Sequence, residues 1–340
     1  MKLVRNAMLV CGLCLPVLAL AQSAAPLTTP TPTPTPMPAP YTAETTYAKL
    51  IAKYPFIRIA GSELPASVRA VRDITYIQRG GHALQLDLYL PAQKPAAPLP
   101  AVVFVHGGGW QTGNRAEFAP VAIRMAERGF ATATVSYRLS PEARYPAAIH
   151  DVKSALRWVR AHAGEYGIDP ARIAVAGGSA GGQIASLVGV TNGVGKFDPD
   201  GAPGSVSSAA QAIVNIDGLS DFTSPAAREN EDNPAKRPTA AGAWLGGSYA
   251  EATDRWREAS PTFYVGSGTP PILFIGSAQA RFAVGREAMI EKMKAQGVAA
   301  QTVLLPDTPH SFWLFDPWLA PTVEATVAFL RTHMAGRGRP

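Results

Sequence analysis

Apolar and polar residues alternate in two distinct rhythms along the chain from residue 74 onward. Continuous apolar runs of about five residues are typical of strands buried on both faces, and apolar residues three and four apart are typical of helices. Two alternating segments around Gly80 and Gly81 predict an antiparallel hairpin, residues 74–78 with 84–90. The further strands predicted are 101–105, 131–135, 172–176, 212–216, 271–275 and 301–305, and the helices are 120–128, 147–163, 184–190, 284–296 and 321–333.

Strand and helix alternate through this whole stretch. That order predicts an α/β fold: a mostly parallel central sheet of about eight strands, with helices on both faces and a hairpin at its start. In such a sheet the ligand lies beyond the carboxyl ends of the strands. We therefore look for functional residues directly after predicted strands.

The N-terminal region has another pattern. Lys2 and Arg5 precede an uncharged apolar run, 7–20, which ends in a small-residue cleavage pattern at Ala21. We interpret residues 1–21 as a signal peptide, too short for a membrane anchor, and expect a secreted or periplasmic protein. Residues 22–40, rich in proline and threonine, predict an extended linker. The catalytic domain is then expected at residues 41–340.

Composition narrows the possibilities further. Both cysteines, Cys11 and Cys14, fall in the predicted signal peptide, so the mature chain would need no disulfide. Loss of Lys2 and Arg5 reduces the formal charge from +6 to +4, and no basic cluster accompanies it, which argues against nucleic acid as a partner. Nothing in the sequence fixes the oligomeric state.

A glycine-rich turn joins one predicted strand to the helix that follows. Residues 177–181 read Gly-Gly-Ser-Ala-Gly, the G-x-S-x-G spacing of a nucleophile elbow around Ser179. A plain glycine-rich turn or a phosphate-binding loop is the alternative for this segment alone.

A serine nucleophile needs a base and an oxyanion site. Of the six histidines, four lie in predicted helices or in the hairpin and His106 belongs to another motif, which leaves His310, after a predicted strand at the edge where Ser179 lies. Residues 106–109 read His-Gly-Gly-Gly after another strand, which predicts an oxyanion hole. Its donors would be the backbone amides of Gly108, Gly109 and Ala180, while His106 orders the loop.

Together these segments resemble α/β-hydrolases of the hormone-sensitive-lipase-like type, and more closely the bacterial esterases grouped with feruloyl and acetylxylan esterases. The resemblance is carried by residues 106–110, 145–148 with Asp151, 177–182 and 309–313. It implies the α/β-hydrolase fold and a serine esterase that works through an acyl-enzyme without metal or cofactor. Asp151 is a structural helix residue in that group.

The chain departs from the pattern of those relatives at the acidic residue that orients the catalytic histidine. Gln279 stands near the position where most of them carry the carboxylate that orients the histidine. Because neighbouring strands are only about 4.8 Å apart, a carboxylate at the end of the preceding strand can still reach His310. We predict Asp217 as the acid, with Asp221, Glu229 and Glu287 as alternatives.

Substrate contacts are predicted from aromatic and cationic residues near this edge. Trp110 and Trp313 could hold a sugar or an aromatic acyl group, and Arg281 and Arg286 could pair with a substrate carboxylate. The sequence thus predicts a secreted serine esterase acting on acetyl, feruloyl or methyl esters of plant-cell-wall polysaccharides. A general short-chain carboxylesterase or lipase is one alternative, and a catalytically impaired carbohydrate-binding homologue, suggested by Gln279, is the other.

Overall fold

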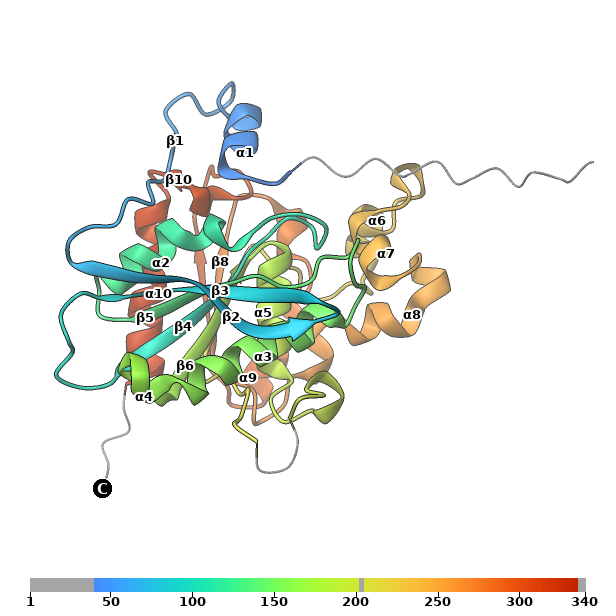
Figure 1. The fold of residues 1–340 in the computed structure, drawn as a ribbon. Helices are drawn as coiled ribbons and strands as arrows, with labels where there is room; N and C mark the ends of the chain where they lie inside the picture. The colour runs from blue at the N-terminus through green and yellow to red at the C-terminus, as the bar shows by residue number, and fades with distance from the viewer. Residues whose placement is uncertain (1–39, 202–204, 336–340) are drawn as a thin grey trace, which may run out of the picture. The chain divides into compact units, whose positions relative to one another are not determined.

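A central β-sheet organises the chain in the computed structural model, which describes residues 40–201 and 205–335 (Figure 1). The predicted signal peptide and all but the last residue of the predicted linker lie outside the described residues. The strands are β1 (Arg58–Ile59), β2 (Val68–Arg79), β3 (His82–Pro91), β4 (Leu99–Val105), β5 (Ala131–Val135), β6 (Ile168–Gly178), β7 (Ile213–Ile216), β8 (Ile272–Gly276), β9 (Ala300–Leu304) and β10 (Phe315–Asp316).

Eight of the strands in the described part of the chain form one sheet in the order β2-β3-β5-β4-β6-β7-β8-β9. The antiparallel pairs are β2 with β3 and β3 with β5, and every later pair is parallel. This is the α/β-hydrolase fold that the sequence predicted. The carboxyl ends of β4, β6 and β7 lie side by side at one edge.

Helices cover both faces of this sheet (Figure 1). The strands are apolar throughout because each face has a layer to pack against: Val103 contacts the layer with α3 and α5, and its neighbour Val102 contacts the layer with α2 and α10. The helices are α1 (Ala43–Leu50), α2 (Ala119–Ala126), α3 (Ala147–Ala161), α4 (Ala163–Tyr166), α5 (Ala180–Val190), α6 (Pro225–Glu231), α7 (Ala240–Leu245), α8 (Tyr249–Glu258), α9 (Arg286–Ala295) and α10 (Leu319–His333).

Two additions were not predicted. Helices α6, α7 and α8 are inserted between β7 and β8 and lie together at one end of the sheet (Figure 1). The N-terminal segment carries α1 and then β1, which pairs with β10 near the C-terminus of the chain. Both additions approach the carboxyl edge of the sheet, so they bear on the candidate site.

None of the helices formed by residues 40–201 and 205–335 is long and apolar enough to cross a membrane.

Candidate active site

Ser179 stands on the sharp turn between β6 and α5. Its backbone has φ 55° and ψ −123°, a strained conformation for a residue with a side chain. The turn closes only because glycine lies two residues away on either side: a Cβ on Gly177 would sit 2.3 Å from the Gly181 carbonyl oxygen, and one on Gly181 would sit 2.1 Å from that of Val105. The turn therefore has the geometry of a nucleophile elbow.

His310 connects Ser179 to Asp217. The Ser179 hydroxyl donates to Nε2 of His310 at 2.8 Å, and Nδ1 of His310 donates to Oδ2 of Asp217 at 3.0 Å. Burial lowers the pKa of His310, and the hydrogen bond that it donates to Asp217 opposes that effect. The imidazole is thus neutral at neutral pH, with the Nε2 lone pair directed at the serine proton.

Asp217 reaches the histidine from the end of β7, the strand beside β8. Its backbone is left-handed, with φ 50°, and its second carboxylate oxygen accepts the Ser277 amide at 2.7 Å. Gln279 is exposed at the start of the turn at Ala280–Ala283, where its backbone N–H donates to Ser277 Oγ. The loop that would carry the acid in relatives here donates a backbone N–H to Asp217.

The other carboxylates weighed for this position lie elsewhere. Asp221 accepts hydrogen bonds from the amide and hydroxyl of Thr223. Glu229 is exposed on α6, and Glu287 is exposed and pairs with Arg286. The structure thus brings only Asp217, among the carboxylates proposed, within hydrogen-bonding distance of His310 in the described residues.

Backbone amides line a cavity at Ser179. Gly109 and Ala180 line a small cavity together with Ser179. Ala180 is the first residue of α5, so its N–H has no acceptor within the helix. Gly108, one residue before Gly109, has φ 106°, and a Cβ there would meet the Thr112 carbonyl oxygen at 2.1 Å. The loop is therefore bare backbone, suited to oxyanion binding.

His106 supports that loop from behind. Its ring stacks on Tyr137 at 4.3 Å, and its Nδ1 donates to the Gly107 carbonyl at 2.8 Å. Burial lowers the pKa of His106 to about 4, so the ring is neutral and takes no part as a cation.

The cavity at Ser179 has a volume of about 80 Å³. Trp110 and Arg281, both predicted to contact substrate, line it. Trp110 is 5% exposed and stacks on Trp244 at 5.0 Å, and the Arg281 guanidinium already pairs with Glu231 at 2.7 Å. Arg281 is thus held by a protein carboxylate at the place where a substrate carboxylate was expected.

Two predicted substrate contacts are wrong. Trp313 is fully buried: it packs beneath the elbow against Phe118 and meets His310 edge-on at 5.5 Å. Arg286 lies behind Asp217, where it pairs with Glu287 and packs on Gly276. Both side chains thus contact the residues that carry the site: Trp313 lies against Gly178 and His310, and Arg286 lies against Gly276.

Sequence reasoning missed two side chains here. Phe282 stacks on the His310 ring with centroids 3.4 Å apart, and Glu231 comes from the unpredicted helix α6. Phe282 lies in the segment after β8, but no local pattern indicates that its ring stacks on a histidine 28 residues later. In the described residues, no group of three or more His, Cys, Asp or Glu side chains is arranged to hold a metal ion.

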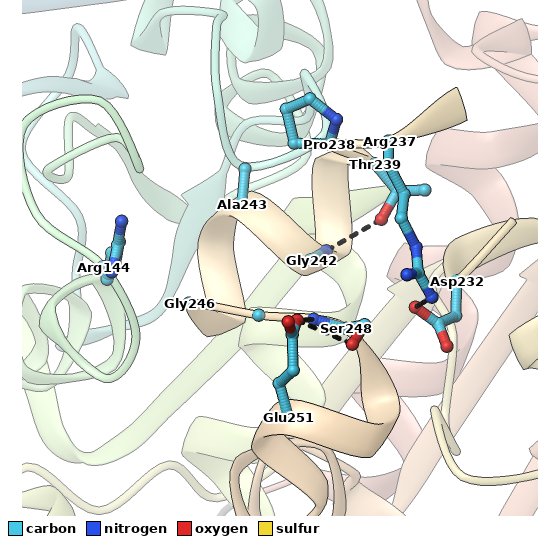
Figure 2. A pocket seen from close by; sticks show the side chains of 11 residues that line it. Arg144, Asp232, Arg237, Pro238, Thr239, Gly242, Ala243, Gly246, Ser248 and Glu251 are labelled. Carbon is cyan, nitrogen blue, oxygen red and sulfur yellow. Dashed lines mark hydrogen bonds and ion pairs between the residues drawn. The ribbon is translucent and has the colours of Figure 1, made fainter. Parts of the chain in front are cut away.

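A second cavity, of about 450 Å³, lies in the α6–α8 insertion (Figure 2). The linings of the two cavities include consecutive residues, since Asp232 directly follows Glu231 and Thr239 directly precedes Ala240. Its carboxylates are engaged: Glu251 accepts the amide and hydroxyl of Ser248, and Asp232 pairs with Arg237 at 3.5 Å. The remaining wall is glycine backbone, the exposed Arg144, and Pro238, Thr239 and Ala243.

The fold and the elbow define the class of protein: an α/β-hydrolase. Comparison with known proteins gives the family. Residues 86–282 match the model of the BD-FAE family, and the chain belongs to that family.

Relatives and solved structures agree with this assignment. The chain is 32% identical over 287 residues to the esterase LipC of Mycobacterium tuberculosis, covering 80% of this chain and 69% of LipC. It is similar to a bifunctional GH43-CE protein of Bacteroides eggerthii (TM-score 0.65, 27% identity, 78% of this chain and 38% of that one). It is also similar to the butyrate-bound thermophilic esterase Est2 of Thermogutta terrifontis (TM-score 0.63, 27% identity, 80% and 97%). The protein is a carboxylic ester hydrolase.

Proposed function

We propose that the protein is an exported serine esterase that removes acetyl groups from plant-cell-wall polysaccharides through an acyl-enzyme. The observation that carries the catalytic part is the hydrogen-bonded chain from Ser179 through His310 to Asp217. Export is supported by the charge and apolar pattern of residues 1–21.

The reaction follows from the positions of these groups. His310 takes the Ser179 proton at Nε2 as Oγ attacks the ester carbonyl, and Asp217 stabilises the imidazolium that forms. The amides of Gly109 and Ala180, with Gly108 in the same turn, stabilise the oxyanion. His310 then gives the proton to the leaving alcohol. In the second half of the reaction His310 takes a proton from water, the water oxygen attacks the acyl-enzyme carbonyl, and the proton returns to Ser179 as the acid is released.

The choice of acetyl rests on the size of the cavity at Ser179. About 80 Å³ is well below the roughly 300–1,000 Å³ of pockets that enclose drug-sized ligands. An acetyl ester needs room for only a methyl group on one side of its carbonyl, whereas a feruloyl ester has bulky groups on both sides.

The second cavity supports the proposal that the substrate is a carbohydrate ester. At about 450 Å³ it falls within the size range of ligand pockets, and its wall combines polar side chains, glycine backbone and the apolar Pro238 and Ala243 (Figure 2). Sugar units next to the esterified one can bind there. The Bacteroides eggerthii structure, named as a bifunctional GH43-CE protein, also favours a carbohydrate substrate.

A substrate panel tests the proposal. We expect acetate release from acetylated xylan, little ferulate from feruloylated arabinoxylan and little methanol from methylated pectin. Ser179→Ala should abolish turnover of p-nitrophenyl acetate and labelling by a fluorophosphonate. Arg144→Ala should raise KM for an acetylated xylo-oligosaccharide and leave p-nitrophenyl acetate unchanged.

The alternatives have distinct outcomes. Turnover of p-nitrophenyl acetate with no release from any polysaccharide would favour a general short-chain carboxylesterase, for which the small cavity is equally suited. Absence of both turnover and a fluorophosphonate adduct would favour the catalytically impaired binder.

A further inference from the structure

We infer that Tyr41 is a positioning residue for His310, and that the segment after it, up to Ala60, serves only to anchor Tyr41. The inference rests on the proposed roles of Ser179 and His310.

Tyr41 meets the catalytic histidine's loop directly. Its hydroxyl donates to Oγ of Ser311 at 2.8 Å, a contact between residues 270 positions apart. Ser311 follows His310, is 3% exposed, and has φ 72°, a conformation that a residue with a side chain holds only when its surroundings fix it. The Tyr41 hydroxyl supplies that constraint one residue from the imidazole.

The Tyr41 ring also lies against the oxyanion loop. A Cβ built on Gly107 would sit 3.4 Å from Cε1 of Tyr41 and 3.3 Å from Cβ of Ser179. One side chain therefore contacts the loop that carries the base and faces the loop that carries the amide donors. The reaction needs both loops in register, since Nε2 and the amides act on the same bound ester.

The rest of the segment fastens Tyr41 in place. The strand β1 pairs with β10, and the Ala60 amide donates to the Leu314 carbonyl at 2.9 Å. Tyr54 and Phe56 each pack edge-on against Trp318, with centroids 5.6 and 5.7 Å away. All of these contacts are made to the ten residues that follow His310, so the segment holds the loop that carries the histidine at several points.

The chemistry of the hydroxyl suits a constant donor. Burial raises the pKa of Tyr41 above its usual range, with the Glu117 carboxylate adding to the effect. The phenol therefore keeps its proton at every pH at which the esterase would be assayed, and Ser311 always has its partner.

Tyr41→Phe tests the inference because it removes only the hydroxyl. We expect kcat for p-nitrophenyl acetate to fall about 10- to 100-fold, the cost of a small misplacement of a reacting group, with KM within about twofold of wild type. Tyr47→Phe is the matched control: its ring contacts Phe315 from the same segment, and its hydroxyl has no hydrogen-bond partner in residues 40–201 and 205–335. That control should keep wild-type kcat.

A double-mutant cycle separates positioning from general loss of stability. Ser311→Ala should lower kcat to the same extent, and the double variant should be no slower than either single variant, because both remove one interaction. Rates of fluorophosphonate labelling at Ser179 should fall in parallel.

Wild-type kcat in Tyr41→Phe, or effects that add in the double variant, would overturn the inference. Loss of activity with equal loss in Tyr47→Phe would overturn it as well. Full activity in Ser179→Ala would instead overturn the proposed function, so the two failures are distinct.

Discussion

Asp217 illustrates how a single residue can take over a role from its usual place. It is left-handed at φ 50°, which turns its carboxylate sideways from the end of β7 towards the space above β8. One oxygen accepts the Ser277 amide and the other accepts His310 Nδ1. The carboxylate is thus fixed from both sides, as an orienting acid must be.

Asp217→Asn should lower kcat by about 10⁴-fold, because a neutral amide can stabilise neither the imidazolium nor the required tautomer. Steady-state kinetics with p-nitrophenyl acetate provide the measurement. Gln279→Asp in the same background should restore nothing, since residue 279 is exposed at the start of its turn. Rescue by that second change would show that the acid belongs to the usual loop after all.

The sequence predicted this residue because the argument needed only two facts, the order of neighbouring strands and the short distance between them. Trp313 and Arg286 were misplaced for a complementary reason. Their loops were correctly assigned to the active edge, but the direction of a side chain within a loop depends on contacts with Phe118, Gly276 and Glu287 that no local pattern encodes.

At the scale of elements, the turn between β6 and α5 packs so closely against the end of β4 that a side chain at Gly181 would not fit. The missing side chain at Gly181 lets α5 approach the carbonyl oxygens of Val105 and His106. Those carbonyls are backbone in the centre of the sheet, so they cannot move aside.

Gly181→Ala should therefore unfold or severely destabilise the protein, by about 3 kcal/mol or more. Gly164→Ala is the matched change: it lies in α4, where a Cβ would meet nothing within 4 Å, and it should leave stability unchanged or raise it by up to about 1 kcal/mol. Urea unfolding of both variants gives the comparison. Equal stability in the two would contradict this account of the elbow.

The elements themselves divide into those that local pattern predicts and those it does not. Buried strands such as β4 are continuous apolar runs because layers cover both faces, so the sequence alone marks them. Helices α6–α8 are short, and they depend on side-chain caps at Ser224, Thr239 and Ser248. The Ser248–Glu251 capping box was a readable signal for α8. The pairing of β1 with β10 joins segments that are far apart in the sequence, so no local pattern predicts it.

At the scale of the whole molecule, stability depends on a buried carboxyl. Glu117 is 7% exposed behind the oxyanion loop, and burial raises its pKa to about 8 from 4.5. Between these values the unfolded chain releases a proton that the folded chain keeps. The contribution of Glu117 to stability must therefore decline as pH rises from about 4.5 to about 8, and level off above that.

Glu117→Gln should remove this decline, because the amide cannot ionise and its oxygen can still accept the Asn114 amide. The free energy of unfolding of the variant, relative to that of the wild type, should rise by about 2–4 kcal/mol between pH 5 and pH 8. Unfolding free energies across that range, with the exposed Glu291→Gln as control, provide the test. A constant difference between variant and wild type would show that Glu117 is ionised in the fold.

The attachment of Tyr41 beside the catalytic loops gives the beginning of the folded domain an unusual importance. A cut within the proline-rich stretch would leave Tyr41 and its contact with Ser311 in place. A cut only a few peptide bonds later would leave the sheet and its nucleophile intact while disarming the enzyme. Full and impaired activity would then be separated by a handful of residues, so the exact start of the purified polypeptide should be determined by mass spectrometry before any rate is compared.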